Sequence, residues 1–200
     1  MLEIIEIKKK IRLKMSEDAY LERELTNEDD SLERYEFLDG YIRNMGYATD
    51  IHELLVLNFS FFLNQFYRKL DFKMYGSNRL LYVENGNRYF YPDLQMVEGE
   101  PVYRIYKKTM KATLNPTLLV EIISDSSEEY DHVEKWNHYQ TISSLKQYVI
   151  ISQKEMKVES YRRVSDEWLY ISVHGEKASI KVLDCEITLS DLYEKVIFEK

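Results

Sequence analysis

Two apolar runs, each holding a single carboxylate, constrain this chain more than any other feature. Residues 91–97 (Tyr-Pro-Asp-Leu-Gln-Met-Val) contain Asp93, and residues 118–124 (Leu-Leu-Val-Glu-Ile-Ile-Ser) contain Glu121. Both runs have the composition of buried strands, and burying an ionised carboxylate is costly unless a cation or strong donors compensate it. Two such carboxylates side by side would repel each other, and a divalent metal ion is one remedy. The runs therefore suggest a hydrolytic metal site built on a sheet.

The composition is that of a folded protein. Of the 200 residues, 44% are hydrophobic and 31% are charged, which suits one domain with a hydrophobic core. We predict a single domain over residues 1–200, with residues 1–14 as a possible N-terminal extension because Met15 is an alternative start. The one cysteine, Cys185, excludes an intramolecular disulfide and fits a reducing compartment. Its alternating surroundings favour a core residue over a nucleophile.

The hydropathy pattern argues against a membrane protein. No apolar run approaches the length of a transmembrane helix. The first seven residues mix acids with apolar residues, and basic residues come only afterwards, which is the wrong order for a secretory signal. We therefore expect a cytoplasmic protein.

Hydrophobic periodicity predicts a mixed α/β domain. An Asp-Gly pair at Asp39 predicts a hairpin over residues 34–45. The polar, basic stretch 98–115 has no clear period and is expected to form a loop or an irregular helix. Helices are expected at 16–25, 51–70, 126–140 and 190–196. Strands are expected at 72–75, 80–83, 89–97, 117–123, 145–151, 157–163, 168–173 and 179–183.

A lysine follows the two carboxylates in the sequence, at a position from which it could assist hydrolysis. If the strands of Asp93 and Glu121 are neighbours, both side chains can hold one metal ion, and Lys135 lies on the helix after Glu121. A lysine beside an attacking water stabilises the negative charge that develops on a phosphoryl group. Other interpretations stay open. Asp93 could be a turn residue, Glu121 could form a buried ion pair with a distant base, and Lys135 could pair with Asp131 on a solvated helix face.

Several short motifs occur in a fixed order over roughly residues 33 to 163. They are Tyr-Glu-Phe-Leu-Asp-Gly at 35–40, His52, Pro-Asp at 92–93, Val-Glu-Ile-Ile-Ser at 120–124, Tyr-Asp-His-Val-Glu-Lys at 130–135, Tyr139 and Leu-Lys-Gln-Tyr-Val-Ile at 145–150. Each motif alone is weak, but the ordered set resembles the PD-(D/E)XK nuclease superfamily and, within it, the Uma family of restriction-endonuclease-like proteins. The resemblance implies a restriction-endonuclease-like core. Its central mixed β-sheet would be flanked by helices, with an N-terminal β-hairpin and a C-terminal strand meander.

The resemblance also implies a metal-dependent endonuclease that hydrolyses DNA. Asp93, Glu121 and the backbone carbonyl of Ile122 would hold Mg²⁺ or Mn²⁺, since hard oxygen ligands suit these ions. Ile123 stands where the superfamily pattern has a lysine, and in the Uma family the helix-borne Lys135 is in the place to substitute for it.

Two further residues match less specific parts of the pattern. His52 would be an additional metal ligand, with a helix-cap or core histidine as the alternative. Glu36 resembles the acidic residue that some members supply from an early element to a second metal or to the water. Its alternative is a hairpin surface residue.

Expected partners follow from charge and chemistry. The net charge of -8 is unfavourable for DNA binding, although local basic patches matter more than the total. Lys107, Lys108 and Lys111 form one candidate DNA-contacting patch, with a solvated face as the alternative. Cutting a duplex takes two strand cuts, so a homodimer is expected. The rival functions are a non-catalytic nucleic-acid-binding or protein-interaction module, and an enzyme of this fold acting on RNA or another phosphodiester.

Overall fold

A computed structural model describes residues 4–7, 10–26, 34–107, 110–124 and 127–198. Their contacts divide the chain into two compact units. The first unit consists of Met1–Tyr47, Arg79–Tyr91 and Val102–Leu114, and the second of Ala48–Asn78, Pro92–Pro101 and Asn115–Lys200. The expectation of a single domain over residues 1–200 stays a prediction.

In the residues that the structure describes, the first unit is an eight-stranded sheet with one helix, α1 (Glu17–Thr26). The expected turn between β3 (Tyr35–Leu38) and β4 (Tyr41–Asn44) is confirmed, because Asp39 and Gly40 have φ angles of 51° and 84°, as in a type I′ hairpin. On α1, Tyr20 stacks on Phe37 with ring centroids 5.2 Å apart. The strands, in their order across the sheet, are β1 (Ile4–Ile7), β2 (Lys10–Lys14), β4 (Tyr41–Asn44), β3 (Tyr35–Leu38), β7 (Arg88–Phe90), β6 (Leu81–Val83), β10 (Met110–Thr113) and β9 (Tyr103–Tyr106).

Two sequence predictions about strands are wrong. The stretch 98–115 contains the antiparallel pair β9–β10 instead of a loop or irregular helix. Strand β9 is at the sheet edge and is only partly buried, so its residues do not alternate between apolar and polar. The expected single strand 89–97 is instead two strands, Arg88–Phe90 and Leu94–Glu98, which belong to different sheets. Pro92 lies between them and interrupts the strand, because it has no N–H to donate to a neighbouring strand.

The second unit is built on a six-stranded mixed sheet and the hairpin β15–β16. In this sheet β11 (Leu118–Ile123) and β12 (Gln147–Ser152) run parallel, and the other pairs of neighbouring strands are antiparallel. The mixed α/β fold class is thus confirmed. The strands, in their order across the sheet, are β14 (Glu167–His174), β13 (Lys157–Val164), β12 (Gln147–Ser152), β11 (Leu118–Ile123), β8 (Leu94–Glu98) and β5 (Phe72–Gly76), followed by β15 (Ser179–Val182) and β16 (Cys185–Thr188).

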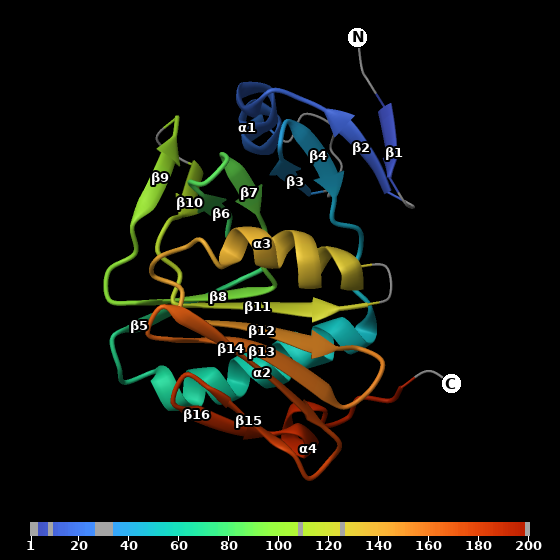
Figure 1. The fold of residues 1–200 in the computed structure, drawn as a ribbon, viewed down its shortest axis with the longest axis vertical. Coiled ribbons are helices and arrows are strands. Elements are labelled where there is room, and N and C mark those ends of the chain that lie inside the picture. The colour runs from blue at the N-terminus through green and yellow to red at the C-terminus, as the bar shows by residue number, and fades with distance from the viewer. Residues whose placement is uncertain (1–3, 8–9, 27–33, 108–109, 125–126, 199–200) are drawn as a thin grey trace. The chain divides into compact units, whose positions relative to one another are not determined.

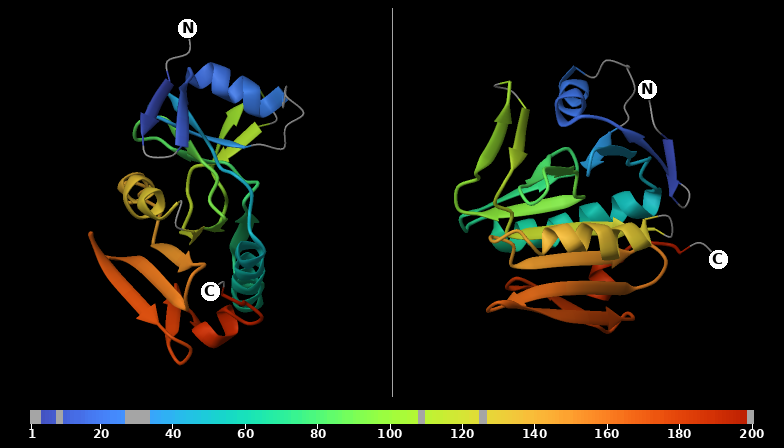
Figure 2. Two further views of the ribbon diagram at one scale, coloured as in Figure 1. Left: turned by 90° about the vertical axis from the view of Figure 1, so that its right-hand side faces the viewer. Right: turned by 45° about the horizontal axis from the view of Figure 1, so that its top comes forward.

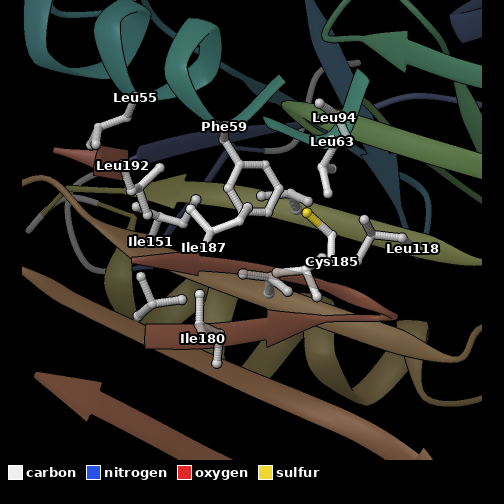
Figure 3. Close-up of a cluster of buried hydrophobic side chains, with 14 of the residues drawn as sticks. Leu55, Phe59, Leu63, Leu94, Leu118, Ile151, Ile180, Cys185, Ile187 and Leu192 are labelled. Atoms are coloured by element: carbon white, nitrogen blue, oxygen red, sulfur yellow. The ribbon is translucent and has the colours of Figure 1, made fainter. Parts of the chain in front are cut away.

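Helices cover both faces of this sheet. Helix α2 (Asp50–Tyr67) lies on one face and α3 (Trp136–Tyr139) on the other (Figures 1 and 2). Leu118, Val120 and Ile122 of β11 belong to the core on the α2 side, together with Phe59 and the buried Cys185 (Figure 3). Because side chains alternate along a strand, Glu121 points to the other face.

The helix expected at 126–140 has an unusual middle section. Tyr130–Lys135 form a π-helix, η1, which continues into α3. The expected C-terminal helix is the short α4 (Leu189–Leu192). No helix in the described part of the chain combines the length and the hydropathy needed to cross a membrane.

The core between α2 and β11 should dominate the stability of the second unit. Leu63 is fully buried in it, whereas Leu70, just beyond the helix, is 53% exposed. We expect Leu63→Ala to lower the free energy of unfolding by about 3 kcal/mol, since it removes apolar contacts and leaves a cavity. The matched variant Leu70→Ala should change it by less than about 1 kcal/mol. Urea unfolding measures both, and equal losses would contradict this packing.

Candidate functional site

Asp93 and Glu121 are placed next to each other by the strand register. In the antiparallel pair β8–β11, Leu94 faces Val120. Asp93 directly precedes Leu94 and Glu121 directly follows Val120, so the two carboxylates come from the same end of this pair. Both carboxylates are buried, with 9% of Asp93 and 3% of Glu121 exposed. The backbone N–H of Ile122 donates to Asp93 Oδ2 over 2.7 Å, which ties the two strand ends together.

The buried charge of Glu121 is compensated by a lysine from the helix above it. Lys135 Nζ lies 2.9 Å from Glu121 Oε1 and 3.1 Å from Asp131 Oδ1, and only 4% of Lys135 is exposed. The hydroxyl of Tyr139 donates to the same Glu121 oxygen over 2.9 Å. The expected pair of Lys135 with Asp131 therefore exists, but in the interior instead of on a solvated face. The ion-pair alternative for Glu121 is also realised, with Lys135 itself as the base.

The π-helix explains how these side chains reach the strand. In η1 each turn is wider than in an α-helix, and Tyr130, Asp131 and Lys135 are all buried. Burial and the negative charges of Glu121 and Asp131 hold the pKa of Tyr148 well above its ordinary value. The Tyr148 hydroxyl therefore stays protonated, and it donates to the Asp131 carbonyl over 3.1 Å.

Asp93 is held from the α2 side as well. His52 Nε2 lies 3.0 Å from Asp93 Oδ1, and Thr49 caps α2 by accepting from the N–H of His52 over 3.1 Å. The Thr49 hydroxyl donates to Gln153 Oε1 over 2.6 Å, and Gln153 Nε2 donates to the Ile122 carbonyl over 3.3 Å. Together with the contact from Ile122 to Asp93, these interactions close a ring around one side of the site.

His52 is neither a plain cap nor a plain core residue. Burial lowers its pKa, but the hydrogen bond and charge of Asp93, with a smaller contribution from Glu53, raise it above the ordinary value overall. His52 Nδ1 is buried without a hydrogen-bond partner in the described chain, with Glu53 Oε1 3.6 Å away. His52 is therefore a buried partner of Asp93, held 3.0 Å from its carboxylate, and its role as a metal ligand stays a prediction.

The site offers oxygen atoms that suit a divalent metal ion. The carboxylates of Asp93 and Glu121 and the carbonyl of Ile122 are hard oxygen donors, which fit Mg²⁺ or Mn²⁺. Within the described ranges, no three side chains of His, Cys, Asp or Glu gather in a metal-binding group. An ion would therefore be held by two carboxylates and a backbone oxygen, with water completing its shell, as Mg²⁺ commonly is.

Glu36 lies in the first unit, on β3. It is 2% exposed, and its Oε1 accepts the backbone N–H of Tyr91 over 3.1 Å, so the hairpin-surface interpretation is wrong. Its catalytic role stays a prediction.

The basic residues expected to contact DNA also lie in the first unit. Lys107 forms an ion pair with Glu22, and Lys111 lies 5.3 Å from the ring centre of Tyr103. Lys108 is outside the described residues.

Sequence reasoning missed Gln153 and the cluster around Glu159. Nothing in the sequence marks Gln153, because its partners are a cap 104 positions away and a backbone carbonyl. Glu159 is 5% exposed and contacts His132, 2.9 Å away, as well as Lys157 and Tyr170. Burial raises the pKa of Glu159, but hydrogen bonds from these three residues outweigh it and lower the pKa overall. The His132 side chain is 20% exposed in this cluster.

Comparison with known proteins identifies the class of fold first. A crystal structure described as a putative nuclease belonging to DUF820, from Anabaena variabilis, superposes with a TM-score of 0.71 at 13% identity. The match covers 90% of this chain and 98% of that chain. The chain therefore has a nuclease-like α/β fold.

The sequence comparison then gives the family. The model of the Uma2 family, described as "Putative restriction endonuclease", matches residues 18–190, and the chain belongs to this family. An uncharacterised Synechocystis protein, sll1609, is 31% identical over 158 residues, which are 78% of this chain and 88% of that protein. A second one, slr1290, is 25% identical over 187 residues, which are 92% of this chain and 94% of that protein.

The pairing of His52 with Asp93 predicts a pH effect in the protein stripped of divalent ions. Asp93→Asn removes the carboxylate that contributes most to raising the His52 pKa and leaves the burial that lowers it, so the pKa should fall relative to wild type. An NMR titration of the imidazole measures this.

The same pair sets the sign of a stability effect. Its contribution should be complete below pH 6.5, the ordinary pKa of histidine, and should be lost as the pH rises through the raised folded pKa. Urea unfolding of wild type and Asp93→Asn across this range gives the difference. An unchanged His52 pKa in the variant would contradict the contact.

Proposed function

We propose that the protein is a Mg²⁺- or Mn²⁺-dependent endonuclease that hydrolyses phosphodiester bonds in DNA. The observation that carries the proposal is the 2.9 Å contact between Lys135 Nζ and Glu121 Oε1. It supports the substitution of the helix lysine for the one missing at Ile123. Membership of the Uma2 family and the nuclease-like fold support the same reaction class.

The roles of the residues follow from their chemistry. Asp93, Glu121 and the Ile122 carbonyl would hold the ion, which when bound would act as a Lewis acid and lower the pKa of water. The ammonium group of Lys135 donates hydrogen bonds to the attacking water and to the phosphoryl oxygens, where negative charge develops. Tyr139 fixes the Glu121 carboxylate, and His52 fixes that of Asp93. Water attacks phosphorus, the bond from phosphorus to the leaving oxygen breaks, and that oxygen takes up a proton.

A non-catalytic binding module is the second candidate. The observation that favours it is the compensation of Glu121 by Lys135 and Tyr139, because these contacts can stabilise a buried carboxylate without a metal. The acidic net charge of -8 points the same way. Under this function Glu121→Gln would alter stability only.

Binding of Mn²⁺ to the purified protein separates these two functions. We expect saturable binding by calorimetry in wild type and its loss in Asp93→Asn and Glu121→Gln. Glu159→Gln is the matched control, because Glu159 is also buried and faces Ile150, as does Glu121, from the next strand. It should bind Mn²⁺ like wild type, with circular dichroism reporting the fold of every variant. Wild type that binds no Mn²⁺, alone or with a DNA oligonucleotide, would contradict the nuclease function.

Cleavage of DNA tests the role of the lysine. With Mn²⁺ present, Lys135→Ala should lower kcat/KM by about 100-fold, the usual effect of removing a charge that stabilises the transition state. Lys135→Arg should recover part of the loss, since it keeps a buried cation beside Glu121. Competition with single- and double-stranded RNA identifies the substrate class. Equal rates for wild type and Lys135→Ala would remove Lys135 from the mechanism.

The basic residues of β9–β10 are proposed to contact DNA phosphates. The segment 102–114 has four basic residues and no acidic one, whereas the chain as a whole carries a net charge of -8. Replacing Lys107 and Lys111 together by Ala should lower the slope of log affinity against log salt by about 2. Fluorescence anisotropy with labelled DNA in EDTA measures binding without cleavage. The control Lys181→Ala, a 55% exposed lysine of the second unit, should leave the slope unchanged.

A further inference from the structure

The outer side of α2 exposes two large apolar side chains in its central part. Leu57 is 64% exposed and Phe61 is 55% exposed, one turn apart. The opposite side of the helix carries the buried Leu55, Phe59 and Leu63. Burying Leu57 and Phe61 against a partner would lower the free energy, so the outer side of α2 has the character of a contact surface.

Six outer positions of α2 have the spacing of a helix–helix seam. The intervals between them are four, three, four, three and four residues, the a/d pattern with which two helices pack together. We call these positions the α2 seam. They are Asp50, Leu54, Leu57, Phe61 and Asn64 of the helix and Arg68, its C-cap residue.

The α2 seam is complementary to itself in the antiparallel direction. When a second α2 runs the opposite way, Asp50 meets Arg68 and Leu57 meets Phe61, and each of these layers occurs twice. Asp50 and Arg68 are exposed, and neither has an ion-pair partner in the part of the chain that the structure describes. A parallel pair would instead oppose Asp50 to Asp50 and Arg68 to Arg68, which like charges disfavour.

The remaining layer fixes the register. Antiparallel packing sets the half-buried Leu54 against the exposed Asn64 of the other helix. Asn64 is the one polar residue between the charged ends of the α2 seam. Such a residue lowers the stability of the dimer, but it also disfavours other alignments of the two helices, because its amide must keep a hydrogen-bond partner or access to water.

We infer that α2 is a homodimer interface, in which the α2 seam of one copy packs antiparallel against that of a second copy. This inference identifies the surface behind the expected homodimer, and it does not depend on whether the protein cleaves DNA. His52 lies on the other side of α2, against Asp93, so the interface leaves that contact in place. Each copy would then retain its own candidate site, as two strand cuts require.

Charge reversal at the two ends of the α2 seam tests the inference. By sedimentation equilibrium wild type should have a mass of about 48 kDa, twice the 24.1 kDa of the chain. Asp50→Arg and Arg68→Asp should each raise the dimer dissociation constant at least about 10-fold, because each creates two like-charge contacts. The double variant should return to within about 3-fold of wild type. Misfolding cannot mimic this recovery.

Two phenylalanines provide a matched pair of controls. Phe61 lies in the α2 seam, whereas the 46% exposed Phe66 lies about 140° around the helix from it. Phe61→Ser should abolish the dimer and Phe66→Ser should not. A wild type that stays at 24.1 kDa up to about 100 µM, a dimer that survives Phe61→Ser, or a double variant that stays monomeric would each overturn the inference. The mass is measured without metal or DNA, so its failure is distinct from failure of the nuclease proposal.

Discussion

The ion pair of Glu121 with Lys135 is the interaction on which the second unit depends. Glu121 lies in the central strand β11 with 3% of its surface exposed, where an uncompensated charge would be prohibitive. Lys135 can compensate it only if the following helix lies across the strand at the right height. The π-helix, the contact with Asp131 and the hydrogen bond from Tyr139 are therefore consequences of one electrostatic requirement. Breaking either partner would leave a buried charge, whereas the pair itself adds little net stability.

The two carboxylates are supported from opposite faces of the same sheet. Lys135 reaches Glu121 from the face covered by η1 and α3, while His52 reaches Asp93 from α2. The site therefore sits where the core packing on both faces determines its geometry. Helix α2 has three roles in this arrangement: its inner side fills the core, its first turn holds Asp93, and its outer side forms the proposed interface. This explains why so apolar a helix has large side chains on both sides.

Much of the fold follows from local patterns in the sequence. The Asp39-Gly40 turn, the continuous apolar run of β11 and the periodicity of α2 each reflect a preference that neighbouring residues set alone. The features of the fold that the sequence analysis predicted wrongly or missed also have physical causes. The edge strand β9 has no buried face to impose alternation, and the break at Pro92 depends on two strands joining different sheets. A π-helix has no distinctive spacing in sequence, because burial of Lys135 and Asp131 selects it.

The sequence alone determined which groups carry the chemistry: two carboxylates in apolar runs, and a lysine one element later in an order typical of a nuclease family. It did so because a charged residue inside a buried strand is conspicuous in any sequence. Only the tertiary structure decided that Lys135 approaches Glu121 within 2.9 Å, and that Gln153 joins the cap of α2 to the Ile122 carbonyl. These contacts join residues from separate elements, and their geometry comes from the packing of helices against a sheet, which no local pattern encodes.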